Sequence, residues 1–540
     1  MNSTNIFDLT FHKAGRGKSE LSIFEPEVAP PISMLHDDLL WLIFMVNTEI
    51  RPANDAQYDR LQIARRTSQV SRRWREVILQ SSSLWGRLID LNALEGPRRE
   101  NWRNEVYTRT GNSLLWICGR LSHSGFFFSL MDRDWARVQR LELHQPQFSL
   151  SSQGNIDSWK ILYRDAPHLQ SVSISSRIIP LSPAQPFIPL FADSASLLRE
   201  FAAVNIKINP RAPWLSNLRS MTLSSPLTIA EMFDTLRMAI LLEELVVENI
   251  PFHVMIQETS AIPGIPHISL PRLNRLHLSG PINACHSFLG NISPAAGCHL
   301  RAEIYQLNTT PDFPSSNEVV NDLSRRILLH WKNLCSVHRP TYLKVISNHH
   351  ELYLSDSFTK HDSPFYISIV RLLGLRISLL TELSTSSCMS FIQTLHLNIG
   401  DISLDLVRPW ISLLPSLCSV TELEVNDRTL QFILQYFPDS SLLFPVLHTV
   451  RVSQMLMLEG HSQYPFGPYF PFLRTRKAAG SPILVFDLTQ TCCPYDMDFL
   501  EELTGLLVRW VDKGTVQEYK CGSGQSGVLQ FEWAQYRSSE

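Results

Sequence analysis

The residues best suited to chemistry are two Cys-His pairs, Cys285-His286 and Cys298-His299, which carry four potential zinc ligands. Structural zinc sites usually take their ligands in two sets, each made of residues a few positions apart. Here the two adjacent pairs are 13 positions apart, and no C-x-x-C occurs among the nine cysteines. The spacing therefore predicts ordinary core and surface residues, with no metal bound.

Two further motifs point towards catalysis, and each lacks a residue that the chemistry needs. The run from Gly15 to Ser19 ends like a phosphate-binding P-loop, but His12 stands where the first glycine is required. His349-His350-Glu351 lacks the second histidine of a zinc-protease helix. The sequence has neither a G-x-S-x-G elbow nor a cysteine in a catalytic context. We therefore expect a protein that is not an enzyme and uses no cofactor.

Length and charge narrow the class of protein. A chain of 540 residues exceeds the size of one compact core, so several domains or a repeat array are expected. The net charge of −3 and the pI of about 6.7 give no basic field, which argues against a nucleic-acid partner. A local group of basic residues is either a solvated helix face or a surface complementary to an acidic partner. It comprises Arg65, Arg66, Arg72, Arg73 and Arg75.

Nothing in the sequence indicates a membrane or a secreted protein. The apolar run 39–46 is far shorter than the roughly 20 residues of a membrane span. Residues 1–30 have no signal-peptide core, and we interpret them as a mobile tail. The scattered cysteines are expected to be reduced. These features predict a soluble protein of the cytoplasm, the nucleus or both.

The elements that would position functional side chains begin near residue 31. Asp37 and Asp38 lead into a short, very apolar stretch, which predicts a helix over 39–46. Further helices are expected over 61–70 and from 71 to 79, with a stop in the serines 81–83. A helix that is apolar nearly all round must bury more than its own small domain can cover.

This segment, residues 31–85, resembles the F-box, a three-helix module that binds the Skp-type adaptor of SCF ubiquitin ligases. The resemblance rests on Leu35 and the acidic Asp37-Asp38, on 68–75 with its Val-x-Arg-Arg-Trp core, and on Leu84-Trp85. It departs from the family at His36, where proline is usual, and at Ser71, where cysteine is common. The version with a polar insertion after the first helix is similar to F-box proteins of mushroom-forming fungi.

The resemblance implies a non-catalytic receptor that docks on the Skp-type adaptor and, through it, on cullin. The implied adaptor-binding residues are Leu35, Leu39, Leu42, Ile43, Phe44, Val70, Trp74, Leu84 and Trp85. From the residues alone, Leu39 and Leu42 suit an interface, whereas Trp74 could equally serve the local core or the interface. Ubiquitin transfer would be carried out by partners, because the chain has no RING-type array of Cys and His.

Beyond residue 136 a short pattern, apolar-x-x-apolar-x-apolar, recurs at intervals of 20 to 31 residues. Leucine-rich repeats have a period of about 20–29 residues, and each repeat supplies one strand and a helix or coil. Units this small bury their apolar faces only by stacking on one another. The middle apolar residues are Leu141, Val172, Phe201, Met221, Leu245 and Leu276, followed by Leu395, Leu423 and Val450.

The expected fold class is therefore α/β: a small N-terminal three-helix F-box (31–90), then an irregular leucine-rich-repeat-like solenoid (136–490). We expect a helical linker or cap over 91–135. The repeat pattern fails over 305–390, which holds degenerate repeats or an insertion. For 491–540 the amphipathic stretch 497–511 predicts a capping helix followed by a tail. The function expected is recruitment of an unknown protein target, and the alternative is a repeat scaffold with no ligase role.

Overall fold

The computed structural model describes most of the chain, and the statements below concern these residues. They are 34–49, 60–94, 96–120, 125–144, 156–175, 189–204, 206–224, 227–248, 266–306, 317–359, 363–437, 443–454, 467–491, 497–525 and 527–530. The expected tail 1–30, with its P-loop-like motif, lies outside the described residues.

Four short helices come first: α1 (Asp37–Asn47), α2 (Arg60–Thr67), α3 (Arg72–Gln80) and α4 (Ser82–Gly86). The acidic first turn of α1 lies at the positive end of the helix dipole. Ser71 caps α3, because its Oγ accepts a hydrogen bond from the backbone N–H of Trp74 at 3.1 Å. The expected helices are present, with the serine run ending α3 and starting α4.

The chain is a mixed α/β protein built on one large, mostly parallel sheet. In its first half each strand pairs in parallel with the preceding strand of the series. These strands are β1 (Ile89–Asp90), β2 (Leu115–Arg120), β3 (Val138–His144), β4 (Ser171–Ser175), β5 (Glu200–Ala203), β6 (Ser220–Leu223), β7 (Glu244–Val247), β9 (Arg275–Pro281) and β11 (His299–Tyr305). A separate parallel pair is formed by β8 (Ile268–Leu270) and β10 (Ile292–Pro294).

The second half repeats this parallel arrangement up to its last strand, which turns back antiparallel. Its strands are β15 (Thr394–Ile399), β16 (Glu422–Asn426), β17 (Thr449–Gln454), β18 (Val485–Asp487), β19 (Leu507–Asp512) and β20 (Thr515–Lys520).

Helices and 3-10 turns connect the strands. The α-helices are α5 (Leu91–Leu94), α6 (Glu100–Thr110), α7 (Phe126–Asp134), α8 (Ile229–Met238), α10 (Ile282–Asn291), α11 (Asn317–Val337), α12 (Leu373–Ser384), α13 (Leu404–Leu413), α14 (Asp427–Tyr436) and α15 (Tyr469–Ala478). The 3-10 turns are η2 (Pro97–Arg99), η3 (Trp135–Arg137), η4 (Ile156–Tyr163), η5 (Leu190–Asp193), η6 (Pro213–Asn217), η7 (Ser387–Phe391), η8 (Leu414–Ser416) and η10 (Asp498–Glu502).

The apolar residues at the middle of the recurring pattern lie opposite one another in the sheet. Leu141 pairs with Val172, and the pairing continues strand by strand to Leu276 and then to Leu300. In the second half Leu395, Leu423 and Val450 pair in the same way. All of these side chains are buried. Stacking strands in this register therefore builds a continuous apolar layer beneath the helices.

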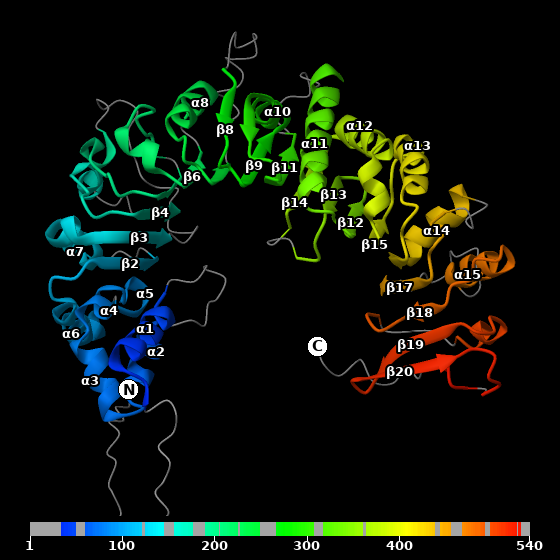
Figure 1. The fold of residues 1–540 in the computed structure, drawn as a ribbon, viewed down its shortest axis with the longest axis horizontal. Helices are drawn as coiled ribbons and strands as arrows, with labels where there is room; N and C mark the ends of the chain where they lie inside the picture. The colour runs from blue at the N-terminus through cyan, green and yellow to red at the C-terminus, as the bar shows by residue number, and fades with distance from the viewer. Residues whose placement is uncertain are drawn as a thin grey trace, which may run out of the picture.

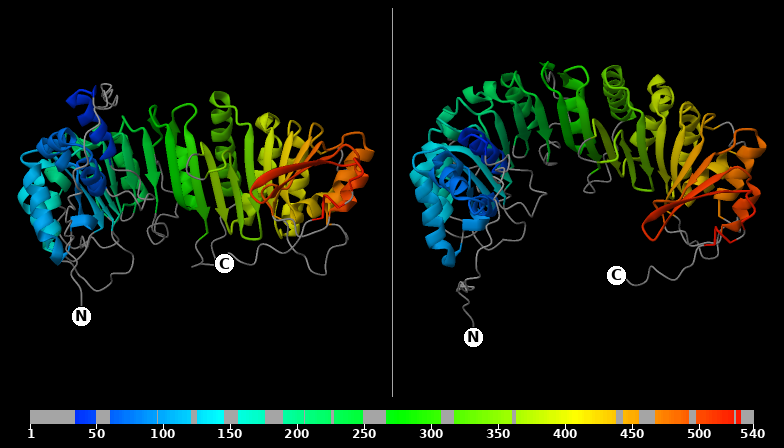
Figure 2. Two further views of the ribbon diagram at one scale, coloured as in Figure 1. Left: turned by 90° about the horizontal axis from the view of Figure 1, so that it is seen from below. Right: turned by 60° about the horizontal axis from the view of Figure 1, so that its bottom comes forward.

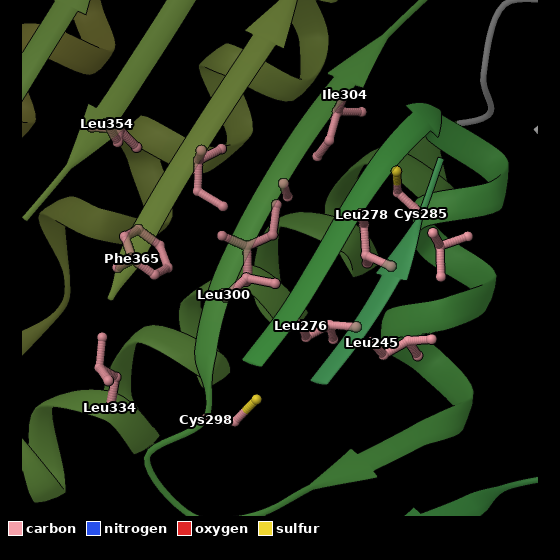
Figure 3. Packing of buried hydrophobic residues seen from close by; sticks show 14 of the residues in the cluster. Leu245, Leu276, Leu278, Cys285, Cys298, Leu300, Ile304, Leu334, Leu354 and Phe365 are labelled. Atoms are coloured by element: carbon pink, nitrogen blue, oxygen red, sulfur yellow. The ribbon is translucent and has the colours of Figure 1, made fainter. Parts of the chain in front are cut away.

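The sheet bends into an arc, with strands lining its inner side and helices covering its outer side (Figures 1 and 2). We call the inner side the concave face. Figure 3 shows part of the core between strands and helices, with Leu245, Leu276 and Leu300 on neighbouring strands and Leu334 on α11. Truncating a buried leucine to alanine in such a core costs about 2–5 kcal/mol.

Residues 305–390 depart from the parallel series. After α11, the strands β12 (Tyr342–Ser347), β13 (Glu351–Ser355) and β14 (Phe365–Val370) form an antiparallel meander. β14 pairs with β11 and β12 with β15, so the spatial order is the reverse of the chain order. The repeat pattern fails here because the chain forms one long helix and an antiparallel meander, where a repeat would supply one strand and one short connection.

The helical linker or cap expected over 91–135 is interrupted by a strand. Helices α5, α6 and α7 are present, but β2 lies between α6 and α7 and already belongs to the sheet. Leu115 and Ile117 are buried and alternate with half-buried residues, which is the period of a strand. The sheet therefore begins at β1, well before residue 136.

The capping helix expected over 497–511 is also wrong. Only the 3-10 turn η10 forms, and the chain then enters the hairpin of β19 and β20. Gly505 interrupts a helix with a φ of 94°, and Val508 and Val511 favour a strand. Residues 527–530 do not belong to the expected tail, because they are held against the fold. Leu529 is buried, and its carbonyl accepts a hydrogen bond from Met497 N–H.

Candidate interaction site

The strongest candidate site is an exposed apolar face on α1. Leu39, Leu42, Ile43 and Val46 are 49%, 51%, 42% and 58% exposed. Their spacing of three, four and seven residues places them on one side of the helix. We call this set the α1 stripe. Contiguous apolar surface of this kind is typical of a protein-binding site.

The opposite side of α1 is buried against α3 and α2. The Phe44 ring meets Trp74 edge-on, with ring centroids 5.3 Å apart. Trp41 Nε1 donates a hydrogen bond to Ser81 Oγ at 2.9 Å. Arg73 of α3 donates to the carboxylate of Asp37 at 2.8 Å and to the carbonyl of Leu35. These contacts fix the rotation of α1 and hence the direction of its stripe.

The structure divides the predicted adaptor-binding residues into exposed and buried groups. Leu39, Leu42 and Ile43 belong to the stripe, and Val70, between α2 and α3, is 63% exposed. Leu35 is half-buried and packs against the core. Trp74 is also half-buried, so that it contributes to the core through Phe44 and remains partly accessible to solvent.

Three predicted interface residues are core residues instead. Phe44, Leu84 and Trp85 are 2%, 0% and 4% exposed, so a docking partner cannot reach them while the helices stay folded. The Trp85 indole lies edge-on to Trp102 and donates a hydrogen bond from Nε1 to the carbonyl of Ile78 at 2.9 Å. The sequence did not separate the two roles, because α1 is apolar on both sides.

Two exposed apolar residues were missed. Val46 extends the stripe by one turn, and its position seven residues after Leu39 was a readable signal. Met34, just before α1, is 79% exposed. A periodicity count over the whole helix would have found Val46, whereas Met34 has no comparable signal.

Basic residues lie on the neighbouring helices. Arg65, Arg66, Arg72 and Arg75 are exposed on α2 and α3, whereas Arg73 is engaged by Asp37. The exposed arginines therefore supply positive charge that an acidic partner could use, and Arg73 has a structural role.

Among the residues that the structure describes, the two Cys-His pairs and the His-His-Glu run do not come together into a reactive centre. Burial raises the pKa of both the Cys285 and the Cys298 thiol to about 12, which keeps them protonated and poor metal ligands. His286 Nε2 lies 2.7 Å from the Asp322 carboxylate. Glu351, from the His-His-Glu run, accepts a hydrogen bond from Ser368. Within the described residues no three His, Cys, Asp or Glu side chains are grouped to hold a metal ion.

In the described part of the chain, no helix combines the length and apolar composition needed to cross a membrane. Comparison with models of protein families and with curated proteins found no match to this chain.

Proposed function

We propose that the α1–α4 segment is an F-box that docks on a Skp-type adaptor and that the chain is a non-catalytic substrate receptor of an SCF-type ubiquitin ligase. In this proposal the curved sheet is a leucine-rich-repeat-like solenoid that recruits a protein target in the cytoplasm or nucleus. Cullin joins through the adaptor, and partner proteins carry out ubiquitin transfer.

The observation that carries the proposal is the α1 stripe. Burying the exposed half of one such side chain contributes about 1 kcal/mol, so Leu39, Leu42, Ile43 and Val46 together contribute about 3–6 kcal/mol before the cost of association. A helix presenting residues at this spacing fits a groove on a partner. The stripe also falls on the residues that resemble the adaptor-binding helix of the F-box.

The arrangement of the chain supports the receptor role over a simple packing role for the helices. The helices lie at one end of the arc, and the strands of the described residues line its concave face (Figure 1). A target held on that face would lie at a distance from the adaptor that the sheet determines. Such positioning raises the effective concentration of target lysines near the charged conjugating enzyme.

The test is co-purification of the full-length chain with a Skp-type adaptor and cullin. Replacing Leu39 and Leu42 by alanine should lower the recovered adaptor at least about tenfold, since each truncation removes roughly 1 kcal/mol or more of buried contact. The fold should persist, because both side chains point away from the core. Circular dichroism of the variant checks this point.

A matched control is the double variant Leu329→Ala and Leu404→Ala, which removes two leucines that are 58% and 82% exposed on α11 and α13. It should leave adaptor recovery unchanged. Unreduced co-purification of the Leu39/Leu42 variant would refute the docking surface. Recovery of neither adaptor nor cullin with the unaltered chain would favour the alternative, a repeat scaffold with no ligase role.

A further inference from the structure

The last strand of the sheet, β20, lies at the end of the arc opposite to the N-terminal helices (Figure 1). Among the described residues β20 pairs with β19 alone, in antiparallel register. Five of its six residues are exposed, and Tyr519 is the buried one. An uncovered edge strand presents a row of backbone donors and acceptors with which another strand can pair.

The turn between β19 and β20 determines which backbone groups of β20 face outwards. Its two residues, 513–514, have φ angles of 48° and 79°, as in the tight turns that join hairpin strands. The flanking Asp512 and Thr515 are therefore a hydrogen-bonded pair, and such pairs alternate along an antiparallel ladder. Cys521 N–H donates to the carbonyl of Leu506 at 2.8 Å, as this alternation requires. The odd-numbered residues of β20 therefore bond to β19.

The even-numbered residues of β20, Val516, Glu518 and Lys520, direct their N–H and carbonyl groups away from β19. No backbone group of the described residues bonds to them. Their side chains share one side of the strand, where Val516 is 61% and Glu518 49% exposed. The strand contains neither a proline nor a bulge, which are common means of keeping an edge strand from pairing.

The chain that follows β20 turns to the other side of the strand. Tyr519 points to that side, and its hydroxyl lies 3.0 Å from Glu501 Oε2 of η10. The N–H groups of Gly522 and Gly524 donate to Glu501 Oε1 at 2.9 Å and 3.0 Å. These bonds hold the start of the segment beside η10 rather than along the outer edge of β20.

The charges on the exposed side of β20 have opposite signs two positions apart. Lys520 has no acidic partner among the described residues, and its side chain is exposed. Glu518 Oε1 lies 2.7 Å from Arg509 of β19, which leaves its other carboxylate oxygen to accept from a further donor. An antiparallel strand with the same two charges in reverse order would match this edge.

We propose that the outer edge of β20 pairs with β20 of a second copy of this chain, in antiparallel register about a twofold axis at Tyr519. In this register Glu518 of each copy lies opposite Lys520 of the other, so that two charge pairs form. Both residues have outward backbone groups, so each pair also exchanges two hydrogen bonds. An axis at Glu518 would instead set two carboxylates opposite each other.

This inference goes beyond the proposed receptor function and does not rest on it, because β20 and the α1 stripe lie at opposite ends of the arc (Figure 1). A six-residue strand buries little surface when it pairs. We therefore expect a dimer that dissociates on dilution.

The test is sedimentation of the full-length chain over a range of concentrations. The mass should rise from 61.7 kDa at low concentration towards twice that value. Glu518→Lys and Lys520→Glu should each weaken the dimer at least about tenfold, because like charges then face each other twice. An equimolar mixture of these two variants should dimerise again, as should the double variant. The control Gln517→Lys adds a charge on the other side of the strand and should leave the dimer unchanged.

A second measurement reports on the backbone. Exchange of the Glu518 and Lys520 amide hydrogens should slow as the concentration of the unaltered chain rises, because these N–H groups become bonded in the dimer. Circular dichroism checks that each variant folds.

Three results would overturn the proposal. One is a chain that stays monomeric at every concentration, as it would if another segment or another protein occupied the edge. The others are a dimer that Lys520→Glu leaves unchanged and a mixture of folded variants that stays monomeric. Failure of adaptor co-purification would refute the docking proposal alone.

Discussion

Replacing Trp85 by alanine is expected to destabilise the N-terminal helices by about 3–5 kcal/mol, the usual cost of removing a buried tryptophan. The side chain is 4% exposed and lies where α4 meets α6. The substitution removes the edge-on contact with Trp102 and the hydrogen bond from Nε1 to the carbonyl of Ile78. Under the proposed docking, adaptor recovery should also fall, because α1 packs on α3 and α3 loses the hydrogen bond that its Ile78 carbonyl accepts from Trp85.

Hydrogen exchange of the full-length chain measures this effect where it occurs. Amides of α3 and α4 should lose protection in Trp85→Ala, while amides of β15 and β16 should keep theirs. In a stacked array each unit contacts only its neighbours, so a loss of stability at one end does not reach distant strands. Trp102→Ala is the control, because Trp102 is 37% exposed and its loss should cost much less. If adaptor recovery fell with unchanged protection, Trp85 would be an interface residue and its assignment to the core would be wrong.

Replacing Arg476 by methionine should release the segment that precedes β17, at a cost of roughly 2–5 kcal/mol. This α15 arginine is fully buried and donates hydrogen bonds to the carbonyls of Leu443 at 2.7 Å and Phe444 at 3.1 Å. Methionine fills much of the space but donates nothing, which leaves two buried carbonyls short of donors. Arg376 of α12 makes the same type of contact with the carbonyls of Asn348 and His349.

The measurement is hydrogen exchange across 443–454, where protection should drop in Arg476→Met. Arg474→Met changes an exposed arginine of the same helix and should leave protection intact. If both variants kept the same hydrogen-exchange protection across 443–454, the buried hydrogen bonds of Arg476 would not be what holds this segment in place.

The spacing of apolar residues predicted those helices and strands in which it follows a single period, either that of a helix or that of a strand. Acidic residues before an apolar run marked α1, and Ser71 marked the start of α3. The recurring apolar triplets marked strands, because residues that alternate along a strand must face a buried layer on one side. In the stretch 497–511 the same leucines fit a helix and a strand, and Gly505 with the β-branched valines decided for the hairpin.

The sequence by itself determined that α1 is apolar, that strands recur and that no complete catalytic motif is present. Only the tertiary structure decided which side of α1 is exposed. Phe44 and Leu42 are both large apolar residues, and they differ only in whether other helices pack against them. Likewise, His396 and Glu424 are separated by 28 positions in the chain, and strand register brings their side chains to within 2.8 Å of each other. Burial and proximity depend on the packing of distant segments, which no local pattern contains.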